Sequence, residues 1–227
     1  EQVDTAPDGR PIYRSIDRSD PDCVVPTAAA CSGRAFNQDF ILTNFDGGES
    51  LVLSLAVSRD HDDIGVSWTA AYAYTQSEDA NPMTSSVAFS NYANVAVSDP
   101  NNPRPATSNY EIPHRFTGRV SWEYDFFDDL TTRATLFGQV SQSRGYSFAF
   151  DRDDGDIFGD FADRRHLLYV PTSASDPLVR FAPGFDTAAF FAYVDANGLT
   201  RGAIDERNSH EGSWWTKMDL RLALKHI

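Results

Sequence analysis

The sequence is poor in cysteine, in basic residues and in long apolar runs. The last two shortages each argue against a class of protein. Of its 227 residues only two are Cys, and 19 Lys and Arg stand against 33 Asp and Glu, a formal net charge of −14. Such an acidic chain lacks the basic stripe that phosphate contacts require, which argues against nucleic acid as a partner. No apolar run reaches the roughly 18 residues of a membrane helix; the best lies at 188–194. A membrane β-barrel needs no such run, so the composition does not exclude this class of protein.

Two common catalytic motifs are also absent. The sequence contains neither G-x-S-x-G, the nucleophile turn of many hydrolases, nor the zinc motif H-E-x-x-H. Its aspartates fall mostly in expected turns and loops, where aspartate is common without any catalytic role. We therefore expect no enzyme activity. The histidines are scattered over expected turns, loops and strand ends: His61, His114, His166, His210 and His226.

The two cysteines, Cys23 and Cys31, lie close together in a stretch rich in Pro, Ala and Ser. Their even count and spacing predict one small disulfide loop in an oxidising compartment such as a periplasm or a cell surface. The alternative is a pair of unbonded small apolar residues. Two ligands are too few for a structural zinc site without recruited histidines.

Alternation of apolar and polar residues, the pattern of β-strands, is the strongest signal in the chain. Between its strands the chain has expected tight turns at Asp60–Asp63 and Phe127–Asp129 and a short expected helix at Asp186–Ala196, with Asp186 as its cap. The alternating segments are 51–57, 64–74, 116–126, 130–141 and 217–225. The expected organisation is a loop at 1–48, two hairpins at 49–144 with a long loop at 77–112, a long loop at 145–213, and the start of a further strand at 214–227.

Three features favour a membrane barrel over a soluble sandwich. Three of the expected strands run about 11–14 residues, against a usual length near 5–6 and about 9–11 for a membrane strand. All strand charges fall on one face of the pattern, and short turns alternate with very long loops, as in outer-membrane barrels. We therefore predict an all-β fold, an antiparallel transmembrane β-barrel segment of about five long strands; a soluble secreted β-sandwich with long loops is the alternative. Aromatic residues are expected near the outer rim (Tyr72, Tyr74, Phe116) and near the periplasmic rim (Tyr124, Phe126, Phe127).

The charged strand residues would then line the barrel interior. There they would either contact a plug domain and set the polarity of the path, or simply wet a water-filled lumen. The expected interior residues are Arg115, Arg119, Glu123, Asp125, Arg133, Lys217, Asp219, Arg221 and Lys225.

A dense acidic run follows residue 150 and is interrupted by Gly155 and Gly159. Carboxylates on Gly-punctuated loops suit hard cations such as calcium, although the spacing fails the EF-hand template. The run therefore predicts either a calcium site or a solvated acidic loop, and calcium is the one cofactor that the sequence suggests. Its carboxylates are Asp151, Asp153, Asp154, Asp156 and Asp160.

Several short segments, in order, resemble the Oar-like TonB-dependent outer-membrane receptors. Ser108–Arg115 (SNYEIPHR) resembles the family's S-N-[YF]-[DE]-x-x-H-R element, which enters a barrel strand. Ser143–Phe148 (SRGYSF) looks like its S-G-R-P-[FY]-S element, with Gly145 replacing proline and the first glycine absent. The resemblance covers most of 41–227, and 1–40 only through Pro7–Pro11. Further landmarks are Ser85-Ser86, Ser90–Tyr92, Asp99–Pro103, Leu168–Pro171, Glu206–Asn208, Trp215 and Asp219–Arg221.

This resemblance implies a barrel of about 22 strands with an N-terminal plug. The chain would be a slice of its C-terminal half, because five strands cannot close that barrel and Ile227 ends in mid-strand without a terminal aromatic residue. The implied protein lies in the outer membrane of a Gram-negative cell, with its loops extracellular and its strands in contact with outer-membrane lipid. It would bind an unidentified extracellular ligand and transport it into the periplasm, driven by the TonB complex acting on the plug. A passive porin or surface adhesin, or a soluble carbohydrate-binding sandwich, is the alternative.

Overall fold

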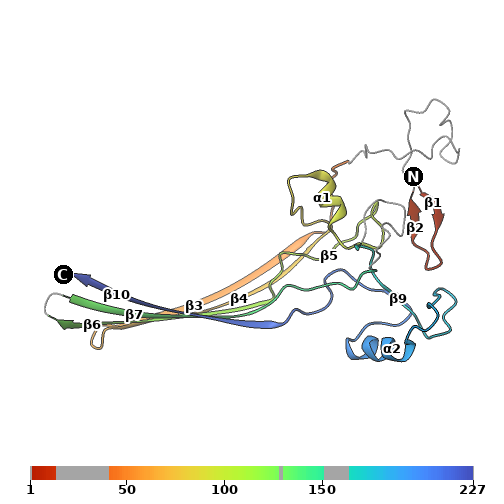
Figure 1. Cartoon of the computed structure of the whole chain (residues 1–227). Coiled ribbons are helices and arrows are strands. Elements are labelled where there is room, and N and C mark those ends of the chain that lie inside the picture. Colours follow the sequence, from red (N-terminus) through yellow and green to blue (C-terminus); the bar gives the residue numbers. More distant parts are fainter. Residues whose placement is uncertain (1, 14–40, 128–129, 151–163, 227) are drawn as a thin grey trace. The chain divides into compact units, whose positions relative to one another are not determined.

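The computed structural model describes residues 2–13, 41–127, 130–150 and 164–226. The chain folds into two compact units, and each unit is built from segments that are distant in sequence. We call them the sheet unit and the loop unit (Figure 1). The sheet unit comprises Gly48–Glu78, Thr107–Tyr146 and His210–Ile227, and the loop unit comprises Glu1–Gly47, Asp79–Ala106 and Ser147–Ser209.

Five long strands form the antiparallel sheet of the sheet unit, in the order β10-β7-β6-β4-β3. Each has 13 or 14 residues, more than twice the usual length of about 5–6. The expectation of an all-β chain with five long antiparallel strands is therefore confirmed. Their bounds are β3 (Glu49–His61), β4 (Val66–Asp79), β6 (His114–Phe127), β7 (Leu130–Gln142) and β10 (Trp214–His226), and the short β5 (Ala106–Thr107) pairs with β4.

The β3–β4 turn begins later than the sequence pattern predicts. Asp60 and His61 still belong to β3, and the turn instead contains Ile64 and Gly65, which the pattern had assigned to a strand. Gly65 has a φ of +66°, and an ideal Cβ there would lie 2.2 Å from the carbonyl oxygen of Glu123. The left-handed conformation favours glycine and the close approach excludes any side chain, so the position of Gly65 favours a chain reversal here.

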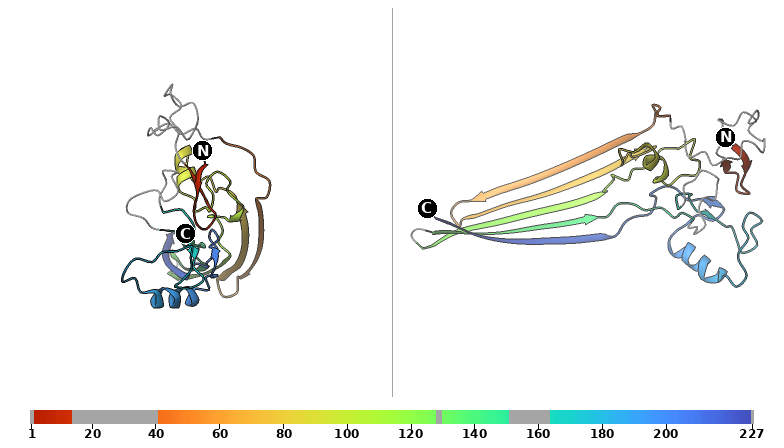
Figure 2. Two further views of the ribbon diagram at one scale, coloured as in Figure 1. Left: turned by 90° about the vertical axis from the view of Figure 1, so that its right-hand side faces the viewer. Right: turned by 45° about the horizontal axis from the view of Figure 1, so that its top comes forward.

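The two edges of the sheet are β3 and β10, so the sheet is open within the described residues. Long strands that are neighbours in the sheet are also consecutive long strands in the chain. The connections from β4 to β6 and from β7 to β10 are long, and the other two are short. The right-hand view of Figure 2 shows the five strands side by side along most of their length. An open edge leaves a row of backbone N–H and C=O groups available to another strand.

The two long connections contain secondary structure of their own within the loop unit. In α2 (Thr187–Ala196) the expected cap is confirmed, because the Asp186 carboxylate accepts a hydrogen bond from the Ala189 N–H at 2.9 Å. A small core of Val170, Val194 and Leu199 packs against Phe148, Leu168 and Phe190. The other elements of this unit are β1 (Gln2–Thr5), β2 (Pro11–Tyr13), α1 (Ala88–Ala93), β8 (Tyr169–Val170) and β9 (Ala203–Ile204).

Candidate functional site: two faces of one sheet

One face of the sheet is apolar across all five strands. Direct cross-strand partners project from the same face of a sheet, so each line of partners forms a row. The rows of this face are half-buried to exposed and dominated by apolar side chains; Leu222, for example, is 70% exposed. An apolar patch this continuous marks an interaction or membrane surface. Two central rows are Leu55–Tyr72–Phe116–Val140–Thr216 and Val57–Ala70–Gly118–Gly138–Met218.

Aromatic rings gather at the end of the apolar face that adjoins the long connections. The rings of Tyr72 and Phe116 lie 4.7 Å apart, and His114 stacks on Trp214 at 6.0 Å. The Tyr72 hydroxyl also makes a 2.9 Å hydrogen bond with Nδ1 of His114. We call this group, together with Tyr74, the loop-end band. Tyr72, Tyr74 and Phe116 were expected at this rim from the sequence. His114 and Trp214 were not, although both continue the period-two pattern of their strands.

A second aromatic group, the turn-end band, lies at the opposite end of the same face. Trp122 and Tyr124 are 5.7 Å apart, and Tyr124 and Phe126 are 4.8 Å apart, measured between ring centroids. Ten residues separate His114 from Tyr124, or about 34 Å along a strand. A strand tilted by about 40° would place the bands about 26 Å apart, close to the height of about 25 Å of the apolar belt of outer-membrane barrels.

The expectation that no charge lies on the apolar face is wrong at three positions near strand ends: Glu49 and Glu78, which are direct partners one row beyond Leu51 and Gln76, and Arg59. Because β3 continues past Val57, Arg59 becomes the direct partner of Trp68 and shares its face. The position is two residues from the end of β3, next to the β3–β4 turn. A long side chain at a strand end can extend its charge towards water while its stem covers apolar surface.

The opposite face is polar and carries all the charged residues predicted to line an interior. The pairing register puts Arg115, Arg119, Glu123, Arg133, Asp219 and Arg221 together on this face, with Asp125, Lys217 and Lys225. Glu123 forms an ion pair with its direct partner Arg133. Lys217 Nζ lies 3.0 Å from a carboxylate oxygen of Asp219.

Neutral polar groups, two aromatic rings and small residues such as Ala56 and Ala71 occupy the rest of this polar face. Ser121 bonds to Thr135 through their hydroxyls at 2.9 Å and accepts a hydrogen bond from Arg119 Nε at 3.2 Å. Phe137 and Trp215 also project from this face, since they pair with Arg119 and Ser141. Phe137 was missed from the sequence, because only charge was expected to mark this face.

Three buried arginines bind backbone carbonyls within the loop unit. Arg10, Arg165 and Arg207 are only 3–4% exposed. Arg10 donates to the Leu167 carbonyl at 2.5 Å and pairs with Asp8 at 2.6 Å. The Arg165 guanidinium lies 4.3 Å over the ring of Tyr92 and donates to the carbonyl of that residue.

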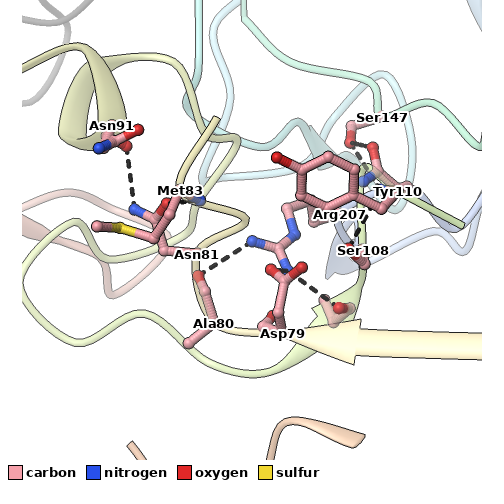
Figure 3. A network of polar contacts seen from close by, with 11 residues as sticks. Asp79, Ala80, Asn81, Met83, Asn91, Ser108, Tyr110, Ser147 and Arg207 are labelled. Carbon is pink, nitrogen blue, oxygen red and sulfur yellow. Dashed lines mark hydrogen bonds and ion pairs between the residues drawn. The ribbon is translucent and has the colours of Figure 1, made fainter. Parts of the chain in front are cut away.

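Arg207 makes the most extensive of these contacts (Figure 3). It donates to the carbonyls of Ala80 at 3.0 Å and Ala106 at 2.9 Å and to the carbonyl of Asp79. It also forms an ion pair with the Asp79 carboxylate at 2.9 Å. Burial lowers the pKa of the guanidinium, and the neighbouring Asp79 carboxylate opposes that shift. Arg207 lies in the Glu206–Asn208 segment of the sequence analysis, and its contacts connect segments of the loop unit that are distant in sequence.

The landmark residue Asn91 has a similar structural role beside α1. Its side chain accepts from the Ser85 N–H at 2.8 Å and donates to the Ser85 carbonyl at 2.7 Å. The Asn91 carbonyl in turn accepts a 3.0 Å hydrogen bond from the Asn81 side chain (Figure 3). Asn91 therefore stabilises the loop before α1 through hydrogen bonds to the backbone of Ser85.

Displaced pKa values also occur at Asp176 and Tyr13 in the loop unit. Hydrogen bonds from the N–H groups of Thr172 and Leu178, and then from the Thr172 and Tyr169 hydroxyls, hold the pKa of Asp176 below its ordinary value of 3.8. Desolvation, followed by a 2.7 Å hydrogen bond to Asp99, raises the pKa of Tyr13 to about 12. These hydrogen bonds connect Asp176 to Thr172 and Leu178, and Tyr13 to Asp99, and so stabilise the segments that contain them.

The other site predictions lie outside the described residues. These are the Cys23–Cys31 disulfide and the calcium ligands Asp151, Asp153, Asp154, Asp156 and Asp160. Within the described ranges, no group of three or more His, Cys, Asp or Glu side chains is placed to hold a metal ion. Nor does any helix in those ranges have the length and apolar character needed to span a membrane.

Comparison with known proteins gave no relative. No protein-family model matches the chain, and neither a curated protein nor a solved structure matches it.

Proposed function

We propose that this chain forms part of a β-barrel in the outer membrane of a Gram-negative cell, with the apolar face of the sheet against lipid and the polar face towards the lumen. The single observation that carries this proposal is the register of the five strands. It aligns mostly apolar residues on one face between two aromatic bands and puts the nine charges predicted for the interior on the other. Aromatic belts at both interfaces and a polar interior are the pattern of outer-membrane barrels.

The open edges support the same proposal. A strand such as β3 or β10, long and unpaired on one side, tends to associate with another strand unless something covers it. In a membrane every backbone polar group must also be satisfied, which closure of the barrel achieves. Further strands of the same protein would pair with β3 and β10 and close the barrel.

We further propose that the protein is a receptor of the TonB-dependent, Oar-like kind, which imports an extracellular ligand into the periplasm. The short family-like segments support this, as do the two long connections, which fold into a unit with buried polar contacts. Loops ordered in this way can present a defined surface to a ligand. A plug domain outside this chain would couple transport to the TonB complex.

Membrane insertion is tested by placing spin labels on adjacent residues with opposite faces. The intact protein first has Cys23 and Cys31 replaced by Ser. Four single-cysteine variants then form two pairs, Leu53→Cys with Ser54→Cys and Leu222→Cys with Ala223→Cys, and each is labelled after reconstitution into lipid vesicles. Labels at 53 and 222 are expected to collide with oxygen dissolved in lipid, and labels at 54 and 223 with a water-soluble nickel chelate. Equal access of the chelate to both members of each pair would exclude the barrel.

Energy coupling is tested separately by titrating the intact protein in detergent with the purified periplasmic domain of TonB. A receptor with a plug and a TonB-binding segment is expected to bind that domain saturably. An inserted protein that does not bind it would instead be a passive porin or an adhesin.

A further inference from the structure

The polar face of the sheet contains a regular series of cations, one in each of six consecutive rows. We call it the cation ladder: Arg115, Lys217, Arg119, Arg221, Arg133 and Lys225, in order from the loop end to the turn end. Successive rows on one face are two residues apart, about 7 Å. The bases come from three different strands, so no repeat in the sequence reveals the series.

The acidic residues of the same face do not neutralise the ladder evenly. The first two rows contain no acid, and the third contains only Asp219, which is paired with Lys217. Glu123 is paired with Arg133 further along. Among the described residues, Arg115, Arg119 and Arg221 form no ion pair, although the whole chain has a net charge of −14. The surplus of positive charge is therefore local and lies nearest the long connections.

Neutral hydrogen-bonding groups occupy the positions between these cations. Thr117 and Gln139 share the row of Lys217, and Ser121 and Thr135 share the row of Arg221. Guanidinium groups bind carboxylate or phosphate through charge-assisted hydrogen bonds, and hydroxyls and amides can complete the coordination. The first four cations alternate between β6 and β10, with β7 between them, so their successive Cα atoms lie roughly 12 Å apart. Two long side chains can reach one anion between them, and such weak multiple sites are what passage requires.

We infer that the polar face guides a small anionic solute, bearing carboxylate or phosphate groups, and that Arg115 and Arg119 make the first contact with it. This inference rests on the proposed barrel, in which the polar face lines the lumen. Charge complementarity favours this occupant: the exposed Arg115, Arg119 and Arg221 form no ion pair in the described part of the chain, so their positive charge is available to an anion.

The test is a calorimetric titration of the intact protein in a non-ionic detergent, with citrate and inorganic phosphate as anionic probes and glucose as the neutral one. Citrate is expected to bind more tightly than phosphate, and glucose not at all. Because exposed charges are screened by salt, citrate affinity should fall between about 50 mM and about 300 mM NaCl.

Variants then assign the binding to the ladder. Arg115→Ala and Arg119→Ala are each expected to weaken citrate binding by about fivefold or more, whereas Arg119→Lys retains most of it because it preserves the charge. Arg104→Ala removes an exposed arginine of the loop unit and should change nothing. Unchanged citrate affinity in both alanine variants, or glucose binding as tight as citrate binding, would overturn the inference.

Spin labelling of the same preparation separates failure of this inference from failure of the proposed function. An inserted barrel that binds neither anion refutes the ladder alone, whereas a protein that does not insert refutes both. A third outcome is that citrate does not bind and that Arg119→Ala makes another segment of the protein accessible to protease. That segment would then be an acidic one that occupies the polar face in the parent protein, and the solute assignment would be wrong.

Discussion

Arg207 and Asp79 form an ion pair with an Nη2–Oδ1 distance of 2.9 Å, although 128 residues separate them in the sequence. The Arg207 side chain is 4% exposed and that of Asp79 is 23% exposed, so water screens the pair weakly. The same guanidinium binds the carbonyls of Ala80 and Ala106. One side chain thus connects both ends of the segment from 79 to 106 to the second long connection.

Replacing Arg207 should therefore loosen the loop unit. Arg207→Ala leaves three carbonyls and one carboxylate without their donor, and breaking a buried pair typically costs about 3 kcal/mol. Arg207→Lys should restore only part of this, since an ammonium group lacks the planar fork that reaches several acceptors. Native-state proteolysis of the intact protein measures the change as faster cleavage within 79–106.

The matched control is Arg201→Ala. Arg201 binds both carboxylate oxygens of Asp195, but the two side chains are 38% and 63% exposed. An exposed pair of this kind contributes less than about 1 kcal/mol. If both alanine variants were cleaved at the same rate, Arg207 would have no special role in holding the unit together.

The turn between β3 and β4 should tolerate no side chain at Gly65. Gly65→Ala places a Cβ against the backbone of Glu123 in a left-handed conformation that alone costs about 1–2 kcal/mol. The matched control is Gly138→Ala, whose Cβ meets nothing within 4 Å. Urea unfolding in lipid vesicles should show a clear loss of stability for Gly65→Ala alone, and equal midpoints would contradict the assigned turn.

The strands were predictable because alternation is a local property of the sequence. Residues such as Tyr72 and Leu220 fall on one face and Arg119 and Asp219 on the other wherever the strand goes, and the register preserves that division. The exact turn was less predictable. The backbone conformation of Gly65, which a sequence pattern does not contain, moves Ile64 into the turn and extends β3 beyond Arg59.

The contacts of the loop unit were not predictable for a different reason. Arg10, Arg165 and Arg207 look like ordinary charged loop residues in the sequence, and each becomes buried only by reaching a distant carbonyl. The cation ladder is similarly hidden, because its order depends on how three strands align. By contrast, the Asp186 cap needs only three residues of local sequence and was predicted correctly.

The stability of the loop unit should fall in acid because of Asp176. Its folded pKa lies below its ordinary value of 3.8, so its stabilising effect is fully present above about pH 4 and is lost as the pH falls through the folded pKa. Asp176→Asn should therefore be less stable than the parent at neutral pH, and the difference should close below pH 3.8. Native-state proteolysis with an acid-tolerant protease measures this difference. Asp195→Asn, on the exposed pair with Arg201, serves as the control, and a gap independent of pH would contradict the assignment.

The face assignment itself makes the sharpest prediction, because Ala70 and Ala71 are adjacent, identical and on opposite faces. Ala70 lies in a central row of the apolar face between Val57 and Gly118, and Ala71 lies on the polar face between Ala56 and Thr117. In a barrel, Ala70→Lys puts a charge near the middle of the lipid and should cost about 2–4 kcal/mol.

Ala71→Lys adds the same side chain to a wet interior and should cost much less. Urea unfolding of the two variants in lipid vesicles compares them directly, with the parent as reference. In a soluble protein with the apolar face exposed, Ala70→Lys would instead improve solubility without loss of stability. That result would reverse the expected order, and the apolar face would then have to face water, because neither lipid nor a protein core could accept the charge so easily.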